Sequence, residues 1–287
     1  MTGRPALALG TVQFGLAYGV AGRDAPVPVN EAQAILRRAW DLGIRRLDTA
    51  PAYGNFEARL AKLVDDLPYS IVTKIDALPS GLTAEAIRTE VGDAVTRARE
   101  RLGERLEGIL FHNAQDLLGS QGEDAWRALT DAAAPFGLAR GVSCYDVPTL
   151  DALERRFGLD MVQISGNALD QAVSRRLATD PEITLRSILL QGLLLMPLEK
   201  AVTKVPRAEG PLVRWHAFCH EQGLSPLRAA LSVAKGMLGG GYCVVGVDSL
   251  EQLEQIAEQW AESEPIQAPQ LDTRDPETID PRRWPGT

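Results

Sequence analysis

The chain has 287 residues, of which 45% are hydrophobic and 24% charged, as is typical of a globular protein with a full core. Its formal net charge of −8 argues against nucleic acid or an anionic membrane as the main partner, because both need a basic surface. Three widely spaced cysteines without a C-x-x-C pair argue against a disulfide framework and indicate a reducing compartment, the cytoplasm. We find no signal peptide, and no apolar run approaches the ~20 residues of a membrane span.

Segments with strand-like composition alternate with segments of helical periodicity along the chain. The expected strands are residues 6–9, 45–48, 71–74, 108–112, 139–144, 161–164, 184–190 and 242–247. The expected helices cover or lie within residues 32–40, 56–64, 87–102, 124–136, 147–157, 171–178, 211–222, 226–237 and 250–260. Eight strands alternating with helices predict a single (β/α)8 TIM barrel over residues 1–287.

An open, doubly wound sheet is the less suitable fold. It would have fewer strands and a glycine-rich fingerprint after the first one, whereas residues 10–15 here contain no G-x-G-x-x-G. From about residue 264 the chain is rich in proline and acidic residues and is expected to be irregular. It is either a disordered end or a tail that folds back through Trp284.

Four polar residues follow three successive expected strands: Asp48 and Tyr53, then Lys74, then His112. In a parallel barrel the carboxyl ends of the strands meet on one face, so these side chains are expected to share a pocket there. A buried lysine needs an anion, which Asp48 supplies. Burial raises the pKa of the Tyr53 phenol and a nearby ammonium lowers it, and if the ammonium prevails the phenol becomes a better proton donor. His112 would donate a second hydrogen bond to a carbonyl oxygen.

Each of these residues also has a purely structural interpretation. Asp48 and Lys74 form an ion pair at a barrel rim in that case, Tyr53 is an aromatic at the core edge, and His112 is a hydrogen-bonded histidine without a chemical role. The placement of all four at one face of the barrel favours the chemical interpretation. A hydride would have to come from a cofactor, since no side chain supplies one.

Segments 9–11, 47–54, 72–74 and 110–113 resemble the signature segments of the aldo/keto reductases, and the resemblance extends over nearly the whole chain. It implies a (β/α)8 barrel and NADPH-dependent reduction of a carbonyl compound. It also implies a tetrad in which Tyr53 is the general acid, Lys74 and Asp48 tune it, and His112 orients the carbonyl.

The resemblance also implies a set of cofactor-binding residues. These are Gly10, Thr11, Ser143, Gln163, Arg186, Ser187, Gly192, Gly246, Ser249 and Gln252. The chain departs from the family pattern at Cys144, where asparagine is usual, and at Arg186, where many members have an aromatic that stacks on the nicotinamide. Gly192 and Gly246 have ordinary turn geometry as their alternative.

The cofactor is expected to be NADPH, with NADH possible. No Lys or Arg lies between Lys235 and Arg274, and the segment thought to meet the adenosine carries Asp248, Glu251 and Glu254 instead. NADPH is therefore expected to be only weakly preferred, unless Lys235 or Arg274 folds back onto the site.

Two other functions stay open: a non-catalytic, cofactor-binding regulatory barrel, and an aldolase that uses Lys74 as a Schiff-base nucleophile. His216 and His220 lie four apart on an expected helix, but without a third ligand they are expected to face solvent, and no metal site is expected. Neither the particular carbonyl substrate nor the oligomeric state can be read from the sequence.

Overall fold

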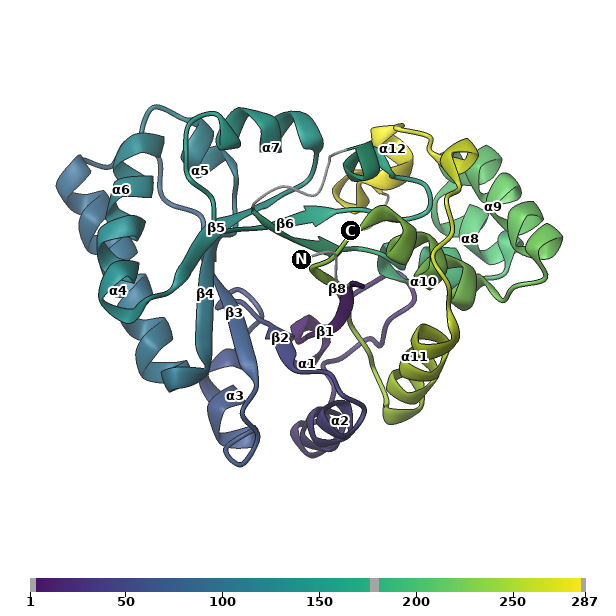
Figure 1. Cartoon of the computed structure of the whole chain (residues 1–287), viewed down its shortest axis with the longest axis horizontal. Helices are drawn as coiled ribbons and strands as arrows, with labels where there is room; N and C mark the ends of the chain where they lie inside the picture. Colours follow the sequence, from purple (N-terminus) through teal and green to yellow (C-terminus); the bar gives the residue numbers. More distant parts are fainter. Residues whose placement is uncertain (1–3, 176–180, 285–287) are drawn as a thin grey trace.

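The computed structural model describes residues 4–175 and 181–284, which form a closed barrel of eight parallel strands arranged in chain order (Figure 1). The strands are β1 (Ala6–Gly10), β2 (Arg46–Asp48), β3 (Ser70–Ile75), β4 (Leu106–Phe111), β5 (Ala139–Cys144), β6 (Met161–Ser165), β7 (Glu182–Arg186) and β8 (Tyr242–Val245). β1 also pairs with β8, with Ala6 opposite Tyr242, so the sheet has no open edge. The predicted (β/α)8 barrel is confirmed.

Helices surround the barrel. The α-helices are α1 (Val12–Gly15), α2 (Val29–Asp41), α3 (Glu57–Leu63), α4 (Ala84–Leu102), α5 (Gln115–Leu118), α6 (Gly122–Ala133), α7 (Val147–Glu154), α8 (Leu198–Lys204), α9 (Glu209–Gln222), α10 (Pro226–Met237), α11 (Leu250–Glu262) and α12 (Pro276–Ile279). The 3-10 helices are η1 (Gly103–Arg105), η2 (Ala134–Phe136), η3 (Ala172–Arg175), η4 (Leu190–Leu195), η5 (Pro206–Ala208), η6 (Pro269–Leu271) and η7 (Pro281–Arg283). Figure 1 shows α4 and α6 on one side of the barrel and α8 to α11 on the other.

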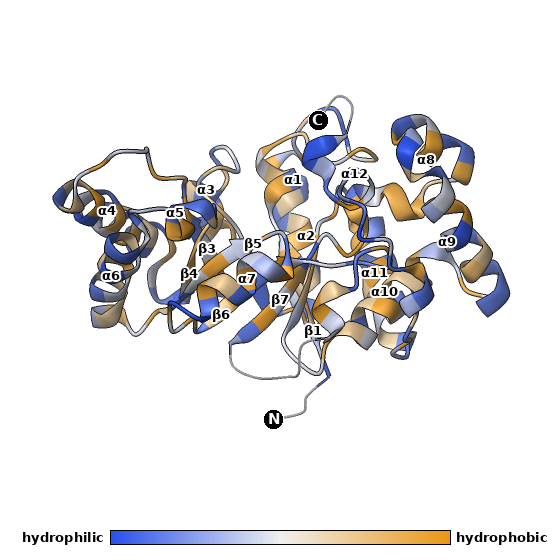
Figure 2. Ribbon diagram, turned by 90° about the horizontal axis from the view of Figure 1, so that it is seen from above, coloured by the Kyte–Doolittle hydropathy of each residue, from blue (hydrophilic) through white to orange (hydrophobic). Residues whose placement is uncertain are grey.

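The core follows from the periodicity of the sequence. In α2 the residues spaced at i, i+3 and i+4, namely Ala32, Ile35, Leu36 and Ala39, are fully buried. β6 is buried at every position, as expected for a strand covered on both faces. Figure 2 shows hydrophobic and hydrophilic colours side by side on single helices such as α4 and α8. The amphipathic pattern thus determines which side of each helix meets the barrel.

Some boundaries differ from the sequence-based expectation. Strand seven was expected to run to Leu190, but β7 ends at Arg186 because Ser187 and Leu190 have φ angles of +61° and +49°, which no strand accommodates. The helix expected over residues 147–157 ends at Glu154. Of the helix expected over 171–178, the structure has η3, and residues 176–178 lie outside the described residues. The sequence also gave no sign of α8, which begins just after Pro197.

The C-terminal segment folds back onto the barrel up to the last described residue. Ala268, Leu271 and Trp284 are buried, and the Trp284 indole donates to the Thr278 carbonyl at 3.2 Å. The Gln171 amide donates to the Ala268 carbonyl at 2.7 Å, which joins this segment to the loop after β6. Of the two alternatives for the tail, the folded-back arrangement is the one observed.

The amino end of the barrel is filled by a buried arginine. Arg46, 4% exposed, contacts Glu107 at 2.5 Å and Glu182, and its guanidinium carbon stands 3.7 Å from the centre of the Tyr242 ring. The four residues belong to β2, β4, β7 and β8. One side chain therefore connects strands from opposite parts of the ring.

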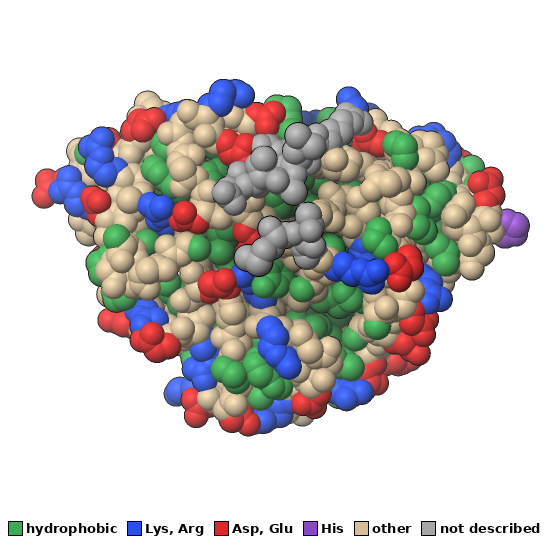
Figure 3. Space-filling view, viewed as in Figure 1, with side chains coloured by type: hydrophobic (Ala, Val, Ile, Leu, Met, Phe, Trp, Pro, Cys, Tyr) green, Lys and Arg blue, Asp and Glu red, His purple; other side chains and the backbone are tan. Residues whose placement is uncertain are grey.

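The distribution of surface charge, the length of the helices and the burial of the cysteines can each be compared with the sequence-based expectations. On the face seen in Figure 3, basic and acidic side chains are interspersed rather than gathered by sign. Across the described ranges, none of the helices has the length and apolar character needed to cross a bilayer. Cys144, Cys219 and Cys243 are all buried, and none of the three takes part in a disulfide.

Candidate active site

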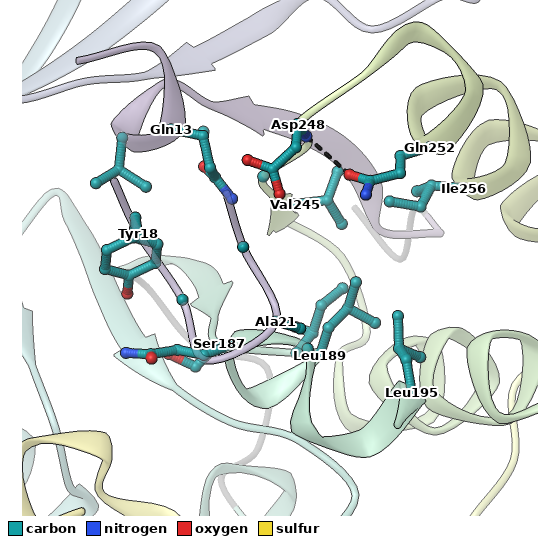
Figure 4. Close-up of a pocket in the computed structure, with 18 of the residues that line it drawn as sticks. Gln13, Tyr18, Ala21, Ser187, Leu189, Leu195, Val245, Asp248, Gln252 and Ile256 are labelled. Atoms are coloured by element: carbon teal, nitrogen blue, oxygen red, sulfur yellow. Dashed lines mark hydrogen bonds between the residues drawn. The ribbon is translucent and has the colours of Figure 1, made fainter. Parts of the chain in front are cut away.

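A cavity of about 580 Å³ opens at the carboxyl ends of the strands, a size typical of small-ligand sites. Its lining includes Asp48 and Tyr53, and Gln252 and Ile256 of α11. Figure 4 shows Tyr18 on one wall and Asp248 on another, with Leu189 and Leu195 below them. The cavity is therefore bounded by side chains from several separate loops and from α11.

Asp48 and Lys74 form a buried ion pair beside the cavity. The Lys74 ammonium donates to Asp48 Oδ1 at 2.8 Å, to Asp48 Oδ2 at 2.9 Å and to the Thr49 carbonyl at 2.8 Å. The Lys74 side chain has no exposed surface. Burial lowers the pKa of Lys74, but the Asp48 carboxylate and the Tyr53 oxygen outweigh burial and the pKa is raised. Lys74 is thus a fixed cation.

Tyr53 is held over this pair by a close packing of two loops. A Cβ on Gly15 would lie 1.7 Å from the Tyr53 carbonyl, and one on Gly54, whose φ is +66°, would lie 2.7 Å from the Gly15 carbonyl. Only glycine fits at both positions. The Lys74 ammonium stands 5.2 Å from the centre of the Tyr53 ring. Burial raises the pKa of Tyr53 more than Lys74 lowers it, so the net pKa is raised and the phenol is protonated at neutral pH.

Burial therefore has a larger effect on the pKa of Tyr53 than the Lys74 ammonium has. The ammonium was expected to improve Tyr53 as a donor if it prevailed, and in this structure it does not prevail.

His112 lies against Tyr53. Their ring centres are 5.9 Å apart at 83°, an edge-to-face arrangement. Burial, with Lys74 adding to it, lowers the pKa of His112 to about 4. The imidazole is therefore neutral at physiological pH and has one N–H to donate. All four residues predicted from the strand ends lie close together, but only Asp48 and Tyr53 line the cavity, and Lys74 and His112 do not.

The residues expected to bind the cofactor divide into two groups. The cavity is lined by Gly10, Gln163, Arg186, Ser187, Gly192, Gly246 and Gln252. It is not lined by Thr11, Ser143 and Ser249. The Thr11 hydroxyl donates to the Asp48 carbonyl at 3.1 Å, and Ser249 caps α11 by accepting from the Gln252 amide N–H at 3.2 Å.

Ser143 and Gln163 extend the polar network of the ion pair. Ser143 donates to Gln163 Oε1 at 3.1 Å, and Gln163 donates through Nε2 to Asp48 Oδ1 at 2.7 Å. A continuous chain of hydrogen bonds therefore runs from β5 through β6 to the Asp48–Lys74 pair.

Several lining residues carried no recognisable signal in the sequence: Gln13, Tyr18 and Lys200. The Gln13 amide lies against Gly246, where a Cβ would come within 2.3 Å of it, and Gln13 Oε1 is buried without a partner among the described residues. An unpartnered acceptor beside a glycine with no side chain fits a cavity built for a polar ligand. Loop residues without periodicity gave no means of finding these positions.

The histidine pair shows no sign of metal binding. His220 is exposed, whereas His216 is partly buried, so the expectation that both face solvent is wrong for His216. In the portion of the chain that the structure covers, no group of three His, Cys, Asp or Glu side chains could hold a metal ion.

Comparison with known proteins agrees with this geometry. The family model described as "Aldo/keto reductase family" matches residues 6–273. A closed parallel barrel with a polar cavity at its carboxyl ends already defines an enzyme-like site of the (β/α)8 class. The family match covers most of the chain, so the chain belongs to the aldo/keto reductase family and is an oxidoreductase.

Solved structures share the fold at low identity. An aldo-keto reductase from Bacillus halodurans in its holo form is 16% identical, with a TM-score of 0.69 and coverage of 96% of this chain and 94% of that one. A glycerol dehydrogenase from Gluconobacter oxydans is 16% identical, with a TM-score of 0.67 and coverage of 91% and 87%. A Pseudomonas aeruginosa protein assigned to the aldo-keto reductases is 24% identical, with a TM-score of 0.64 and coverage of 89% of each chain. A search of curated protein sequences finds no significant match.

Proposed function

We propose that this oxidoreductase reduces an aldehyde or ketone to an alcohol, with Tyr53 as the proton donor. The observation that carries the proposal is a protonated, half-buried phenol whose ring centre lies 5.2 Å from the ammonium of the Asp48–Lys74 ion pair, in the lining of a cavity of about 580 Å³. A nicotinamide cofactor supplies the hydride when bound.

The side chains carry out the proton chemistry. Tyr53 holds its proton at neutral pH and gives it to the carbonyl oxygen as negative charge develops there. The Lys74 ammonium then stabilises the phenolate that remains. Asp48 keeps Lys74 charged and in place, and the neutral His112 donates its N–H to the same carbonyl oxygen.

The remaining lining of the cavity suits a dinucleotide. Gly10, Gly246 and Gln13 would contact the dinucleotide along its length. Gln163 would bind the carboxamide of its nicotinamide. The proposed cofactor is NADPH, with NADH as an accepted alternative. Lys235 donates to the Ser263 carbonyl and Arg274 pairs with Asp272, so neither cation lines the cavity.

Charges in the cavity lining support a weak preference between the two cofactors. Both Asp248 and Lys200 of α8 line the cavity, so the lining carries one charge of each sign from these residues. The nearby Arg23 is paired with Glu31 at 2.9 Å and donates to the Asp248 carbonyl at 3.2 Å. Comparing kcat/KM for NADPH and NADH tests this. A preference of about a thousandfold, ~4 kcal/mol, would contradict it.

The two alternative functions, a Schiff-base aldolase and a regulatory barrel, agree less well with the environment of Lys74. A Schiff-base lysine attacks as a free, accessible amine, whereas Lys74 is fully buried, charged and bonded to three oxygens. A regulatory barrel has no need for a phenol over an ion pair.

The test is a screen of cofactor oxidation over aldehydes, ketones and sugar-type carbonyls, with the alcohol product identified. Borohydride trapping with the same carbonyl compounds is the control. A covalent adduct on Lys74 would overturn the reductase proposal in favour of an aldolase. Cofactor binding without turnover of any carbonyl class would overturn it in favour of a regulatory barrel.

A further inference from the structure

Arg186, at the end of β7, contributes a positive charge to the cavity without a matching carboxylate. Nη2 donates to the Cys144 carbonyl at 3.1 Å and Nη1 to the Ser187 hydroxyl at 3.3 Å, and both acceptors are neutral. Among the residues that the structure describes, Arg186 forms no ion pair, and its surface is partly withdrawn from water. Its charge acts to lower the pKa of the buried Asp170, but no hydrogen bond or ion pair joins the two side chains. A half-buried guanidinium without a directly paired carboxylate is costly, which points to an anionic partner from outside the chain.

A second arginine nearby, Arg282, differs from Arg186 because its guanidinium is paired with a carboxylate. The Arg282 guanidinium carbon stands 3.4 Å from the centre of the Tyr145 ring, and that of Arg186 stands 4.0 Å from it. Both cannot share one face at these distances, so Tyr145 is flanked by the two cations. Arg282 is neutralised by Asp280, with bonds of 2.8 and 2.6 Å, and does not line the cavity. Arg186 lines it and has no such partner.

The guanidinium of Arg186 lies near the residues proposed for proton transfer. Arg186, Asp48 and Tyr53 line the same space. After burial and Lys74, Arg186 also helps to lower the pKa of His112, which places its charge near the imidazole. In Figure 4 the Tyr18 ring carries its hydroxyl toward the loop that begins at Ser187.

The guanidinium is also held in place in advance. It is stacked on Tyr145 and bonded to two neighbouring acceptors. The next residue, Ser187, has a φ of +61°, and Gln191 has +54°. Strained backbone of this kind concentrates at ligand sites, and it fixes the direction in which β7 ends.

We propose that Arg186 binds an anionic group of the carbonyl substrate, so that the enzyme selects oxo acids or phosphorylated aldehydes over neutral carbonyl compounds. This rests on the proposed reductase function. A guanidinium suits either group, because carboxylate and phosphate both present paired oxygens to its fork of N–H donors. The other anion that could meet Arg186 is the pyrophosphate of the cofactor, and the experiment separates the two.

The kinetic test uses pairs of aldehydes that differ in charge but little in shape. One pair is 4-formylbenzoate and 4-formylbenzamide, and the other is glyceraldehyde 3-phosphate and glyceraldehyde. For each pair the ratio of kcat/KM, anionic over neutral, is measured in the wild type, in Arg186→Gln and in Arg186→Lys. Any change in cofactor binding affects both members of a pair and cancels in the ratio.

The wild type is expected to favour the anionic member of at least one pair, and the better pair tells carboxylate from phosphate. Arg186→Gln should lower that ratio by about ten- to hundredfold, the range of a charge-assisted hydrogen bond, and Arg186→Lys should recover part of it. Arg282→Gln is the matched control and should leave the ratio unchanged. An unchanged ratio in Arg186→Gln together with a raised Kd for the cofactor would assign Arg186 to the pyrophosphate and overturn the proposal.

A binding measurement keeps the inference separate from the reductase function. Calorimetric titration with 4-methylbenzoate, 4-methylbenzamide and inorganic phosphate needs no turnover. Weaker binding of benzoate or phosphate to Arg186→Gln, with Arg282→Gln unaffected, would support the anion site even if no carbonyl were reduced. Equal binding of benzoate and benzamide to the wild type, without binding of phosphate, would overturn it.

Discussion

Tyr53 is surrounded by groups that move its pKa in opposite directions, and burial is the larger effect. Its proton is therefore available at neutral pH. Tyr53→Phe should lower carbonyl reduction by about 10²-fold or more while leaving cofactor affinity nearly unchanged, because in the proposed reaction the phenol donates the proton but does not hold the dinucleotide. Steady-state kinetics beside a cofactor titration measures both. Tyr69→Phe removes a buried phenol whose hydroxyl bonds the Leu36 carbonyl and serves as a folding control. Wild-type turnover in the Tyr53 variant would contradict the assignment.

Lys74 lowers the pKa of Tyr53 in opposition to burial, so its removal should raise that pKa further. Reduction requires the protonated phenol, so in Lys74→Met the alkaline limb of the pH–rate profile should move to higher pH. The free energy of unfolding should also fall by about 3 kcal/mol, because Asp48 keeps only the Gln163 hydrogen bond at its carboxylate. Profiles and unfolding curves for both proteins provide the measurement. Full activity with an unmoved alkaline limb would leave Lys74 a structural role only.

At the scale of elements, the positions of the strands accounted for most of the site residues that the sequence could predict. Asp48, Lys74 and His112 follow short buried runs, and a parallel barrel places the ends of such runs together whatever the loops do. The helical faces were equally predictable from periodicity. The loops were not, because Gln13 and Lys200 reach the cavity through chain conformations that have no repeat. The turn after β7 was missed for the same reason, since Ser187 has a positive φ that its residue type does not suggest.

The loop between β6 and η3 contains a carboxyl that opposes folding at neutral pH. Burial raises the pKa of Asp170 to about 6, with the nearby Asp272 adding to the effect. The folded protein therefore binds this proton more tightly than the unfolded chain does. Its contribution to stability is complete below the unfolded pKa near 4 and is lost as the pH rises through about 6.

Asp170→Asn removes this titration and should stabilise the protein by up to about 2 kcal/mol at pH 8, with little effect at pH 4. The backbone bonds between Asp170 and Asn167, both 3.0 Å, do not depend on the side chain. Denaturant unfolding of the two proteins at both pH values gives the comparison. A stability difference that is the same at pH 4 and pH 8 would show that ionisation of Asp170 is not its cause.

For the whole molecule, Arg46 connects the ring across its amino end. Arg46→Met keeps most of the volume but leaves Glu107 and Glu182 without their cation and Tyr242 without its stacked partner. The free energy of unfolding should fall by roughly 2–4 kcal/mol, while the ratio of activities on different carbonyl compounds should not change, because the site lies at the opposite end. Unfolding curves and kinetics on two aldehydes check both parts. Arg45→Met, which removes a guanidinium stacked on Trp40 outside the ring, is the control.

Two loops meet beside the cavity. Residues 18–22, after α1, approach residues 187–197, after β7: a Cβ on Gly192 would lie 2.6 Å from the Ala21 side chain, and one on Gly19 would lie 3.4 Å from the Gln191 carbonyl. Figure 4 shows Ala21 beside Leu189, where the two loops come together. If the proposed dinucleotide binds beneath this contact, the two loops have to part once per turnover to exchange spent cofactor for fresh, and the frequency of that opening then sets an upper limit on the speed of the enzyme.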